Sequence, residues 1–319
     1  MFYKATQSQR NFRNKVSVYK NPLFNFIKVL SPSDVSINSL YWFKVYKASD
    51  FPLFTVTTDY FAIGSTDHSN NPTVIWGECD DMYMRGFVEK GTIPIDYAET
   101  PFLIKITTSE SGLASDEYFL YYHTGTDDPD NAGIQATHLV TTSGGNQPHL
   151  CTWTQQGKVL GNSGSETHTG YLNVIKRGTS DYIGFHTTMT SVGTWKMSTS
   201  PDGLNWTRGG LIDITLNLPA NYNCSHGSIY PFIYNGTSYV MSSFWITNTD
   251  IRGVMICEHD ANYRPIGTPH IMFYFYEQGT DYTMGFEGDY IYIYYKWGDG
   301  NTDVLGSYYA RAYDLKQLL

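Results

Sequence analysis

Apolar and polar positions along this chain form short runs of β-branched and aromatic residues, each ending at Gly, Asn, Asp, Ser or Pro. Helical spacing of apolar residues is almost absent. Runs of this composition, bounded by turn residues, are typical of β-strands. Representative runs are PLFTVTT, PTVIWGE, EYFLYYHT, DYIGFHTT, SYVMSSFWIT and DYIYIYYKW. The pattern therefore predicts an all-β protein.

The order of the predicted strands repeats along the chain. Five groups of strands begin near residues 50, 99, 166, 225 and 277, at a spacing of about 45–65 residues. Radial repetition of four-stranded sheets is the architecture of a β-propeller, whereas a β-sandwich does not repeat a four-strand order. We therefore predict a five-bladed β-propeller with four antiparallel strands per blade over residues 45–319. Residues 1–44 are predicted to form a basic N-terminal arm.

One hairpin supports the propeller. The segment Ser200-Pro201-Asp202-Gly203-Leu204-Asn205-Trp206 lies between the third and fourth strands of the third group. Asp202 is expected to accept hydrogen bonds from the turn backbone, Gly203 to supply a positive φ, and Trp206 to pack on the sheet. The segment resembles the Asp-box hairpin of propeller glycosidases. That resemblance implies a structural role for Asp202 and not a catalytic one.

Composition narrows the functional classes. Aromatic residues make up 16% of the 319 residues, which excludes a disordered chain. The net charge of −9 disfavours a general nucleic-acid binder. Residues 1–33 hold six basic residues and no acidic one, so we expect a solvated arm or a strand that closes the fold. No apolar run has the length of a membrane span or a signal peptide, and we expect the protein to be cytoplasmic or part of a virion.

The four cysteines are widely separated. Because none forms a CxxC pair, the spacing predicts neither a zinc site nor a redox motif. We expect free, mostly buried thiols, no metal centre and no cofactor, although a structural cation in the channel stays open. The cysteines are Cys79, Cys151, Cys224 and Cys257.

Acidic residues recur where the innermost strands are predicted to start. In a propeller the first strand of each blade lines the central channel, so these positions converge at one mouth. A repeated acid there indicates function, because buried polar groups are costly unless they are paired. We expect Asp50, Glu99 and Glu166 to be catalytic. The expected substrate-binding residues are His168, His226 and Asp281, with Glu277 as an alternative to Asp281.

These features together resemble the five-bladed propeller glycoside hydrolases of families 43 and 32. Asp50-Phe51-Pro52 is similar to the family's acid-x-Pro segment, whose Asp is a general base or nucleophile. Glu99-Thr100-Pro101 is similar to its Glu-x-Pro segment, whose Glu is the general acid. In that family the acid usually lies on the third blade, with an orienting acid on the second. The resemblance therefore implies either Glu166 as the acid supported by Glu99, or Glu99 as the acid.

Two functions follow. The first is hydrolysis of a poly- or oligosaccharide in the central channel, which requires two carboxyl groups about 5–9.5 Å apart. The alternative is a non-catalytic, carbohydrate-binding propeller of a viral tail or surface structure. The two differ in the placement of the acids, because hydrolysis needs them to converge at one mouth. Ion-paired or separated acids favour the binding module. Either function implies a carbohydrate partner, no nucleic acid and no membrane span, and leaves the oligomeric state open.

Overall fold

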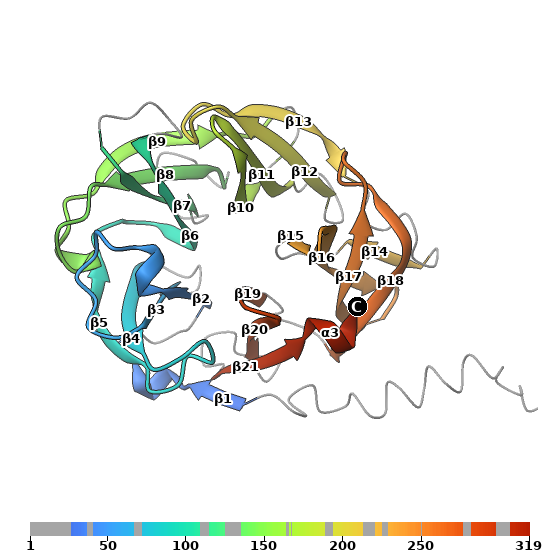
Figure 1. Ribbon diagram of the computed structural model, residues 1–319, viewed down its shortest axis with the longest axis horizontal. Helices are drawn as coiled ribbons and strands as arrows, with labels where there is room; N and C mark the ends of the chain where they lie inside the picture. The colour runs from blue at the N-terminus through green and yellow to red at the C-terminus, as the bar shows by residue number, and fades with distance from the viewer. Residues whose placement is uncertain are drawn as a thin grey trace, which may run out of the picture.

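The computed structural model contains five antiparallel sheets arranged in a ring around a common centre (Figure 1). The strands β2, β6, β10, β15 and β19 lie nearest to this centre. The residues that the structure describes are 27–36, 41–66, 72–108, 115–124, 135–163, 166, 168–188, 194–212, 221–224, 229–249, 251–276, 282–297 and 307–319.

Within each of the first three blades the strand order follows the chain. The first blade contains β2 (Tyr41–Lys47), β3 (Tyr60–Ser65), β4 (Val74–Cys79) and β5 (Val88–Ile93). The second contains β6 (Ala98–Ile106), β7 (Glu117–Thr124), β8 (Thr137–Thr142) and β9 (Thr154–Leu160). The third contains β10 (Thr169–Gly178), β11 (Asp181–Thr188), β12 (Thr194–Ser200) and β13 (Thr207–Ile212).

The last two blades depart slightly from this plan. In the fourth, two short strands share one neighbour, since both β14 and β15 pair with β16. Its strands are β14 (Tyr222–Cys224), β15 (Tyr230–Tyr234), β16 (Thr237–Ile246), β17 (Ile251–His259) and β18 (Pro265–Tyr276). The fifth contains β19 (Tyr282–Glu287), β20 (Tyr290–Trp297), β21 (Ser307–Asp314) and, from the other end of the chain, β1 (Ile27–Leu30).

Short helical segments occur outside the sheets. They are the 3₁₀ segments η1 (Pro32–Asp34), η2 (Ala48–Asp50) and η3 (Pro148–Leu150), and the helix α3 (Leu315–Leu318). No helix among the described residues is long and apolar enough to cross a membrane.

The N-terminal segment closes the ring. Strand β1 pairs antiparallel with β21, with Ile27 opposite Ala310 and Leu30 opposite Tyr308. The fifth blade therefore takes its outermost strand from the start of the chain. The propeller thus includes residues that the sequence analysis assigned to the arm, and its first blade begins at Tyr41, before the expected boundary at residue 45.

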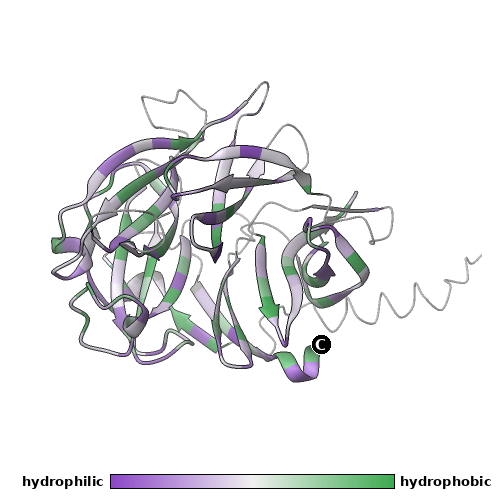
Figure 2. Cartoon of the chain, turned by 45° about the horizontal axis from the view of Figure 1, so that its top comes forward, coloured by the Kyte–Doolittle hydropathy of each residue, from purple (hydrophilic) through white to green (hydrophobic). Residues whose placement is uncertain are grey.

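The hydrophobic core of the described residues is divided into five clusters between neighbouring blades, and the cluster between the third and fourth blades also includes Tyr41 and Trp42 of the first. Between the first and second blades, for example, Trp76 of β4 and Tyr118 of β7 are fully buried. Hydrophobic and hydrophilic residues mix along the strands (Figure 2). The five-bladed, all-β prediction is confirmed.

The Asp-box hairpin has the predicted structural role. The Asp202 Oδ1 atom accepts hydrogen bonds from the amides of Leu204 at 2.8 Å and Asn205 at 2.7 Å. Gly203 has a φ of +75°, and the Trp206 indole donates to its carbonyl oxygen at 3.0 Å. The turn connects β12 to β13.

Three of the cysteines are free and buried, as predicted: Cys79, Cys151 and Cys257. Burial raises the pKa of the Cys79 thiol to about 12. These thiols therefore serve as small apolar side chains in the core and carry no chemistry at neutral pH.

Candidate functional site

All inner strands start at the same end of the channel. A blade of four antiparallel strands returns the chain to the end at which its first strand began, so the next blade starts there as well. We call this the strand-start end. Helix α3 follows β21, the third strand of its blade, and so lies at the opposite end, which faces the viewer in Figure 1.

Three inner strands begin with the same irregularity. The pairing registers of β2, β6 and β10 each shift by one extra residue, which is a β-bulge. The first residue of each bulge has a positive φ, between 48° and 55°. The bulged pairs are Trp42-Phe43, Thr100-Pro101 and Tyr171-Leu172. The backbone of β2, β6 and β10 therefore has the same conformation at equivalent positions of the three blades, close to the strand-start end.

These bulges bring together a buried group of polar and aromatic side chains, which we call the strand-start cluster. It consists of Glu99, Thr100, His123, His168 and Tyr171, each at most 2% exposed. The Glu99 Oε2 atom lies 3.0 Å from Nε2 of His123, and the Thr100 hydroxyl contacts Nδ1 of the same ring. A neutral His123 satisfies both contacts if Nε2–H donates to the carboxylate and Nδ1 accepts from the hydroxyl.

Aromatic rings surround this hydrogen-bonded pair. The rings of His168 and Tyr171 stack with centroids 5.4 Å apart, and His123 lies 5.0 Å from His168. From the first blade, the Tyr41 hydroxyl lies 2.9 Å from that of Tyr171, and the Trp42 ring lies 4.8 Å from the Tyr171 ring. Three blades therefore contribute to one polar, aromatic centre at the strand-start end.

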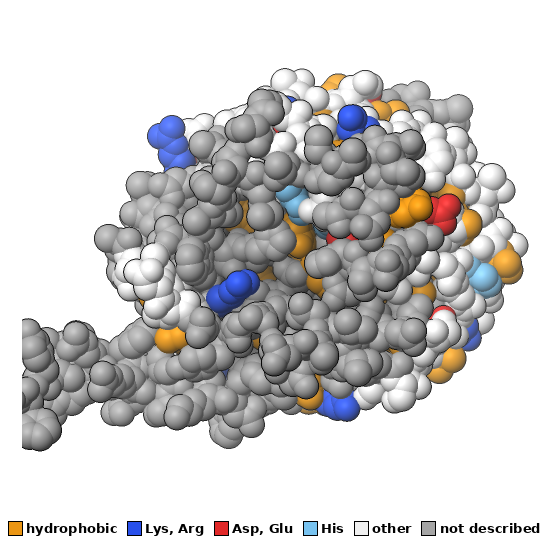
Figure 3. All heavy atoms as spheres, turned by 180° about the vertical axis from the view of Figure 1, so that it is seen from behind, with side chains coloured by type: hydrophobic (Ala, Val, Ile, Leu, Met, Phe, Trp, Pro, Cys, Tyr) orange, Lys and Arg blue, Asp and Glu red, His pale blue; other side chains and the backbone are white. Residues whose placement is uncertain are grey.

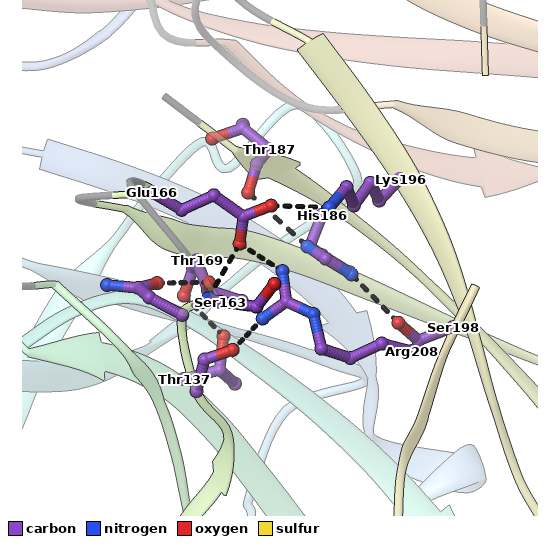
Figure 4. Close-up of polar contacts among 11 residues, drawn as sticks. Thr137, Ser163, Glu166, Thr169, His186, Thr187, Lys196, Ser198 and Arg208 are labelled. Atoms are coloured by element: carbon purple, nitrogen blue, oxygen red, sulfur yellow. Dashed lines mark hydrogen bonds and ion pairs between the residues drawn. The ribbon is translucent and has the colours of Figure 1, made fainter. Parts of the chain in front are cut away.

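Glu166 lies beside this cluster, three residues before β10, and is held by two cations (Figure 4). Its carboxylate pairs with Lys196 and Arg208 and accepts a hydrogen bond from the Ser163 amide at 3.0 Å. Burial alone would raise the pKa of Glu166, but the Lys196 hydrogen bond, the Ser163 amide and the Arg208 charge outweigh it and lower that pKa. A carboxyl group kept ionised in this way is a poor proton donor, so the geometry favours a structural or positioning role.

The neighbouring His186 also has a structural role, because its side chain contacts another buried side chain of the same blade. Its Nε2 atom lies 2.9 Å from the Ser198 hydroxyl, and the side chain is fully buried (Figure 4). Burial lowers the pKa of His186 to about 3. The ring is therefore neutral at physiological pH and adds no charge to the Glu166 ion pairs.

Asp50 does not occupy the expected position. The sequence analysis placed it at the start of the first inner strand, but that strand is β2, which ends at Lys47, and Asp50 belongs to the following segment η2. It is exposed and lies at the end of the channel opposite to Glu99. The residue of the first blade that corresponds to Glu99 is Tyr41, because each is the last paired residue before the bulge of its strand. Asp50 and Glu99 are therefore not brought together.

The other expected residues divide into two groups. His168 lies in the strand-start cluster, where it forms a parallel bridge with Gln135. His226, Glu277 and Asp281 lie outside the described residues, so their roles stay predictions. Figure 3 shows the face opposite to that of Figure 1, on which histidine, acidic and hydrophobic side chains are visible near the middle.

The sequence analysis missed His123 and Lys44. His123 ends the run EYFLYYHT and was read as part of a strand; its only signal is a polar residue at the strand-start end of an apolar strand. Lys44 interrupts the apolar run YWFKVYK in β2. Its ammonium group lies over the ring of Phe102 in β6, at 4.2 Å from the centroid, and 5.6 Å from that of Tyr230 in β15. Lys44 therefore reaches across the channel between blades.

Among the residues that the structure describes, no group of three or more His, Cys, Asp and Glu side chains is arranged to hold a metal ion.

Solved structures share this fold over most of the chain. No protein-family model and no curated protein matches the sequence. Zg3597, a family 117 glycoside hydrolase of Zobellia galactanivorans, matches with a TM-score of 0.57 and 11% identity, covering 91% of this chain and 90% of its own. A glycosyl hydrolase from Bacteroides ovatus matches with 0.54 and 14%, covering 94% and 93%. A family 43 endo-arabinanase from Bacillus licheniformis matches with 0.51 and 12%, covering 86% and 94%.

The chain thus has the five-bladed propeller fold that these glycoside hydrolases share. At such low identities the similarity establishes the fold, and the function has to be argued from this chain's own residues.

Proposed function

We propose that the protein binds a carbohydrate at the strand-start end of its channel. The observation that carries this proposal is the strand-start cluster, in which a carboxylate, two histidines and a tyrosine from two blades are gathered at one end of a propeller shared with glycoside hydrolases. Sugars present hydroxyl groups and an apolar ring face, and polar-tipped aromatic side chains complement both.

The placement of the acids favours binding over the three-carboxylate hydrolysis scheme. Asp50 lies at the opposite end of the channel, and Glu166 is paired with Lys196 and Arg208. Hydrolysis by two carboxyl groups needs one protonated and one ionised group on either side of the bond. Recognition of a glycan needs no proton transfer, so the placement of Asp50 and the ion pairs of Glu166 do not oppose it.

Hydrolysis is the second candidate, and the Glu99–His123 pair is the observation that favours it. A buried carboxylate bonded to an imidazole is an arrangement used for proton transfer. In this reading Glu99 is the essential carboxylate, Glu166 positions neighbouring groups, and Asp281 is the first residue to test for the second carboxyl group.

A glycan array and a panel of chromogenic glycosides, each applied to wild type and Glu99→Gln, test both functions. We expect wild type to bind a defined set of glycans and Glu99→Gln to lose at least about tenfold in affinity, since a charge-assisted contact contributes about 1.5–3 kcal/mol. Cleavage by wild type with a loss of about 10²–10⁴-fold in Glu99→Gln would establish the hydrolase.

The matched control is Glu117→Gln. Glu117 begins β7 in the same blade, at the opposite end from His123. The Glu117→Gln substitution should leave glycan binding and turnover unchanged. If wild type binds no glycan, or if Glu99→Gln binds and cleaves as wild type does, the channel end is not the functional site.

A further inference from the structure

Lys44 occupies an unusual place for a lysine, because its ammonium group points among aromatic rings in the channel. Its Nζ atom lies 4.2 Å from the Phe102 centroid, 5.5 Å from that of Tyr46 and 5.6 Å from that of Tyr230. The rings come from the inner strands of the first, second and fourth blades. The ammonium group therefore lies toward the channel axis and not in a cluster between two blades.

The position of Lys44 relates it to the strand-start cluster. Lys44 is the first regularly paired residue after the bulge of β2, and Phe102 is its equivalent after the bulge of β6. The two side chains therefore lie one level deeper in the channel than Tyr41 and Glu99. A ligand held at the strand-start end would therefore lie next to Lys44.

No carboxylate of the described part of the chain compensates this charge. Among the described residues, no Asp or Glu side chain forms an ion pair with Lys44, although the side chain is only partly exposed. Burial lowers the pKa of Lys44 to about 7. Ring faces stabilise a cation by less than the cost of removing an ammonium group from water. The Tyr46 hydroxyl accepts the Leu103 amide hydrogen at 3.1 Å, and no hydrogen bond joins it to Lys44 among the described residues.

A methionine would fill the same space without that cost, so packing does not account for a lysine here. A negatively charged group of a ligand would pair with the ammonium group, and the rings of Phe102 and Tyr230 would lie beside the ligand's apolar face. We propose that Lys44 receives the anionic group of an acidic sugar, so that the ligand is a uronate-containing or sulfated glycan. This inference rests on the proposed carbohydrate binding at the strand-start end.

The test uses matched pairs of oligosaccharides that differ only in charge. Uronate oligosaccharides are compared with their methyl esters, and sulfated oligosaccharides with their desulfated forms, by isothermal titration calorimetry. Wild type should bind at least one acidic oligosaccharide more tightly than its neutral partner, by at least about tenfold. Lys44→Met should remove this preference, and Lys44→Arg should keep part of it.

Lys105→Met is the matched control. Lys105 lies on the neighbouring inner strand β6 but pairs with Asp116 at 3.2 Å, away from the rings around Lys44. The Lys105→Met variant should keep the wild-type preference for acidic over neutral oligosaccharides. The pH provides a second readout that needs no variant: the acidic preference should fall as the pH rises from 6 to 9, because Lys44 loses its proton.

The outcomes separate this inference from the proposed function. If neutral and acidic forms bind equally to wild type, or if Lys44→Met keeps the acidic preference, the role of Lys44 is refuted while carbohydrate binding stands. If no oligosaccharide of either charge binds, the proposed function itself fails, and the inference with it. Which of the uronate and sulfate series binds identifies the anionic group.

Discussion

The Tyr121 hydroxyl of the second blade donates a hydrogen bond of 2.8 Å to the Gly203 carbonyl oxygen in the Asp-box turn of the third blade. Tyr121 is fully buried, and burial raises the pKa of its hydroxyl well above the ordinary value, so the group remains a donor at any physiological pH. The turn therefore fastens two blades together in addition to closing its own hairpin.

Tyr121→Phe should lower the free energy of unfolding by about 1–2 kcal/mol, because it leaves the buried Gly203 carbonyl oxygen without this donor. Chemical denaturation of both proteins measures the difference. Tyr290→Phe is the control, since Tyr290 is 45% exposed and its replacement should change the stability by less than about 0.5 kcal/mol. Equal losses in the two variants would show that the contact does not join the blades.

Asp202→Asn should likewise destabilise the fold and leave any binding or turnover unchanged. The Asp202 carboxylate accepts hydrogen bonds from two turn amides and from the Asn205 side chain. Its neutral amide replacement keeps only one acceptor atom, so we expect a loss of about 1–2 kcal/mol in unfolding free energy. Parallel measurement of glycan affinity checks the second half of the prediction. A specific loss of affinity at full stability would instead give Asp202 a functional role.

The sequence predicted the propeller because strand order and turn residues repeat along the chain, and such a repeat leaves few other architectures. It misplaced the first inner strand because two apolar runs, YWFKVYK and DFPLFTVTT, stand next to each other. Only the first has a partner strand, since Lys44 lies opposite Ile63 in β3. That error moved Asp50 from one end of the channel to the other.

The site was harder to predict than the fold, because it depends on contacts between residues that are distant in sequence. Glu99 was identified from its place before an apolar strand. Its partner His123 is 24 positions away, and the two are close because Glu99 lies opposite His123 in the pairing of β6 with β7. The two cations that pair with Glu166 come from β12 and β13, and the sequence around residue 166 does not predict these ion pairs.

Glu166→Gln should destabilise the protein by about 2–4 kcal/mol at pH 7, because it leaves Lys196 and Arg208 close together without their shared carboxylate. The folded state lowers the pKa of Glu166, so its contribution is present above the ordinary glutamate pKa and is lost as the pH falls through the lowered value. Melting temperatures of wild type and Glu166→Gln should therefore converge below about pH 4.

The control for this prediction is Glu117→Gln. Its melting temperature should change with pH in the same way as that of wild type. If Glu166→Gln were as stable as wild type at pH 7 but inactive, the carboxylate would have a direct chemical role and the ion pairs would be incidental.

Lys44→Met should change the pH dependence of stability in a different, more alkaline pH range. The folded state lowers the pKa of Lys44 to about 7 from an ordinary value of 10.5. Below pH 7 the folded state therefore contains a buried positive charge, which lowers the free energy of unfolding. This cost decreases as the pH rises from about 7 toward 10.5, because the folded protein has already lost the proton. Wild type should gain stability relative to Lys44→Met over that interval, as measured by urea denaturation at several pH values. A constant difference would mean that Lys44 keeps its ordinary pKa in the folded protein.

Strand β1 provides the last prediction, because it joins the start of the chain to the fifth blade. Leu30 lies opposite Tyr308 and is 2% exposed in the cluster between the fifth and first blades, whereas Ile27 on the same strand is 45% exposed. Leu30→Ala should therefore lower the unfolding free energy by about 2–4 kcal/mol through lost burial and the cavity it leaves. Ile27→Ala should cost less than about 0.5 kcal/mol. Denaturation midpoints compare the two variants, and similar small losses in both would show that β1 does not hold the ring closed.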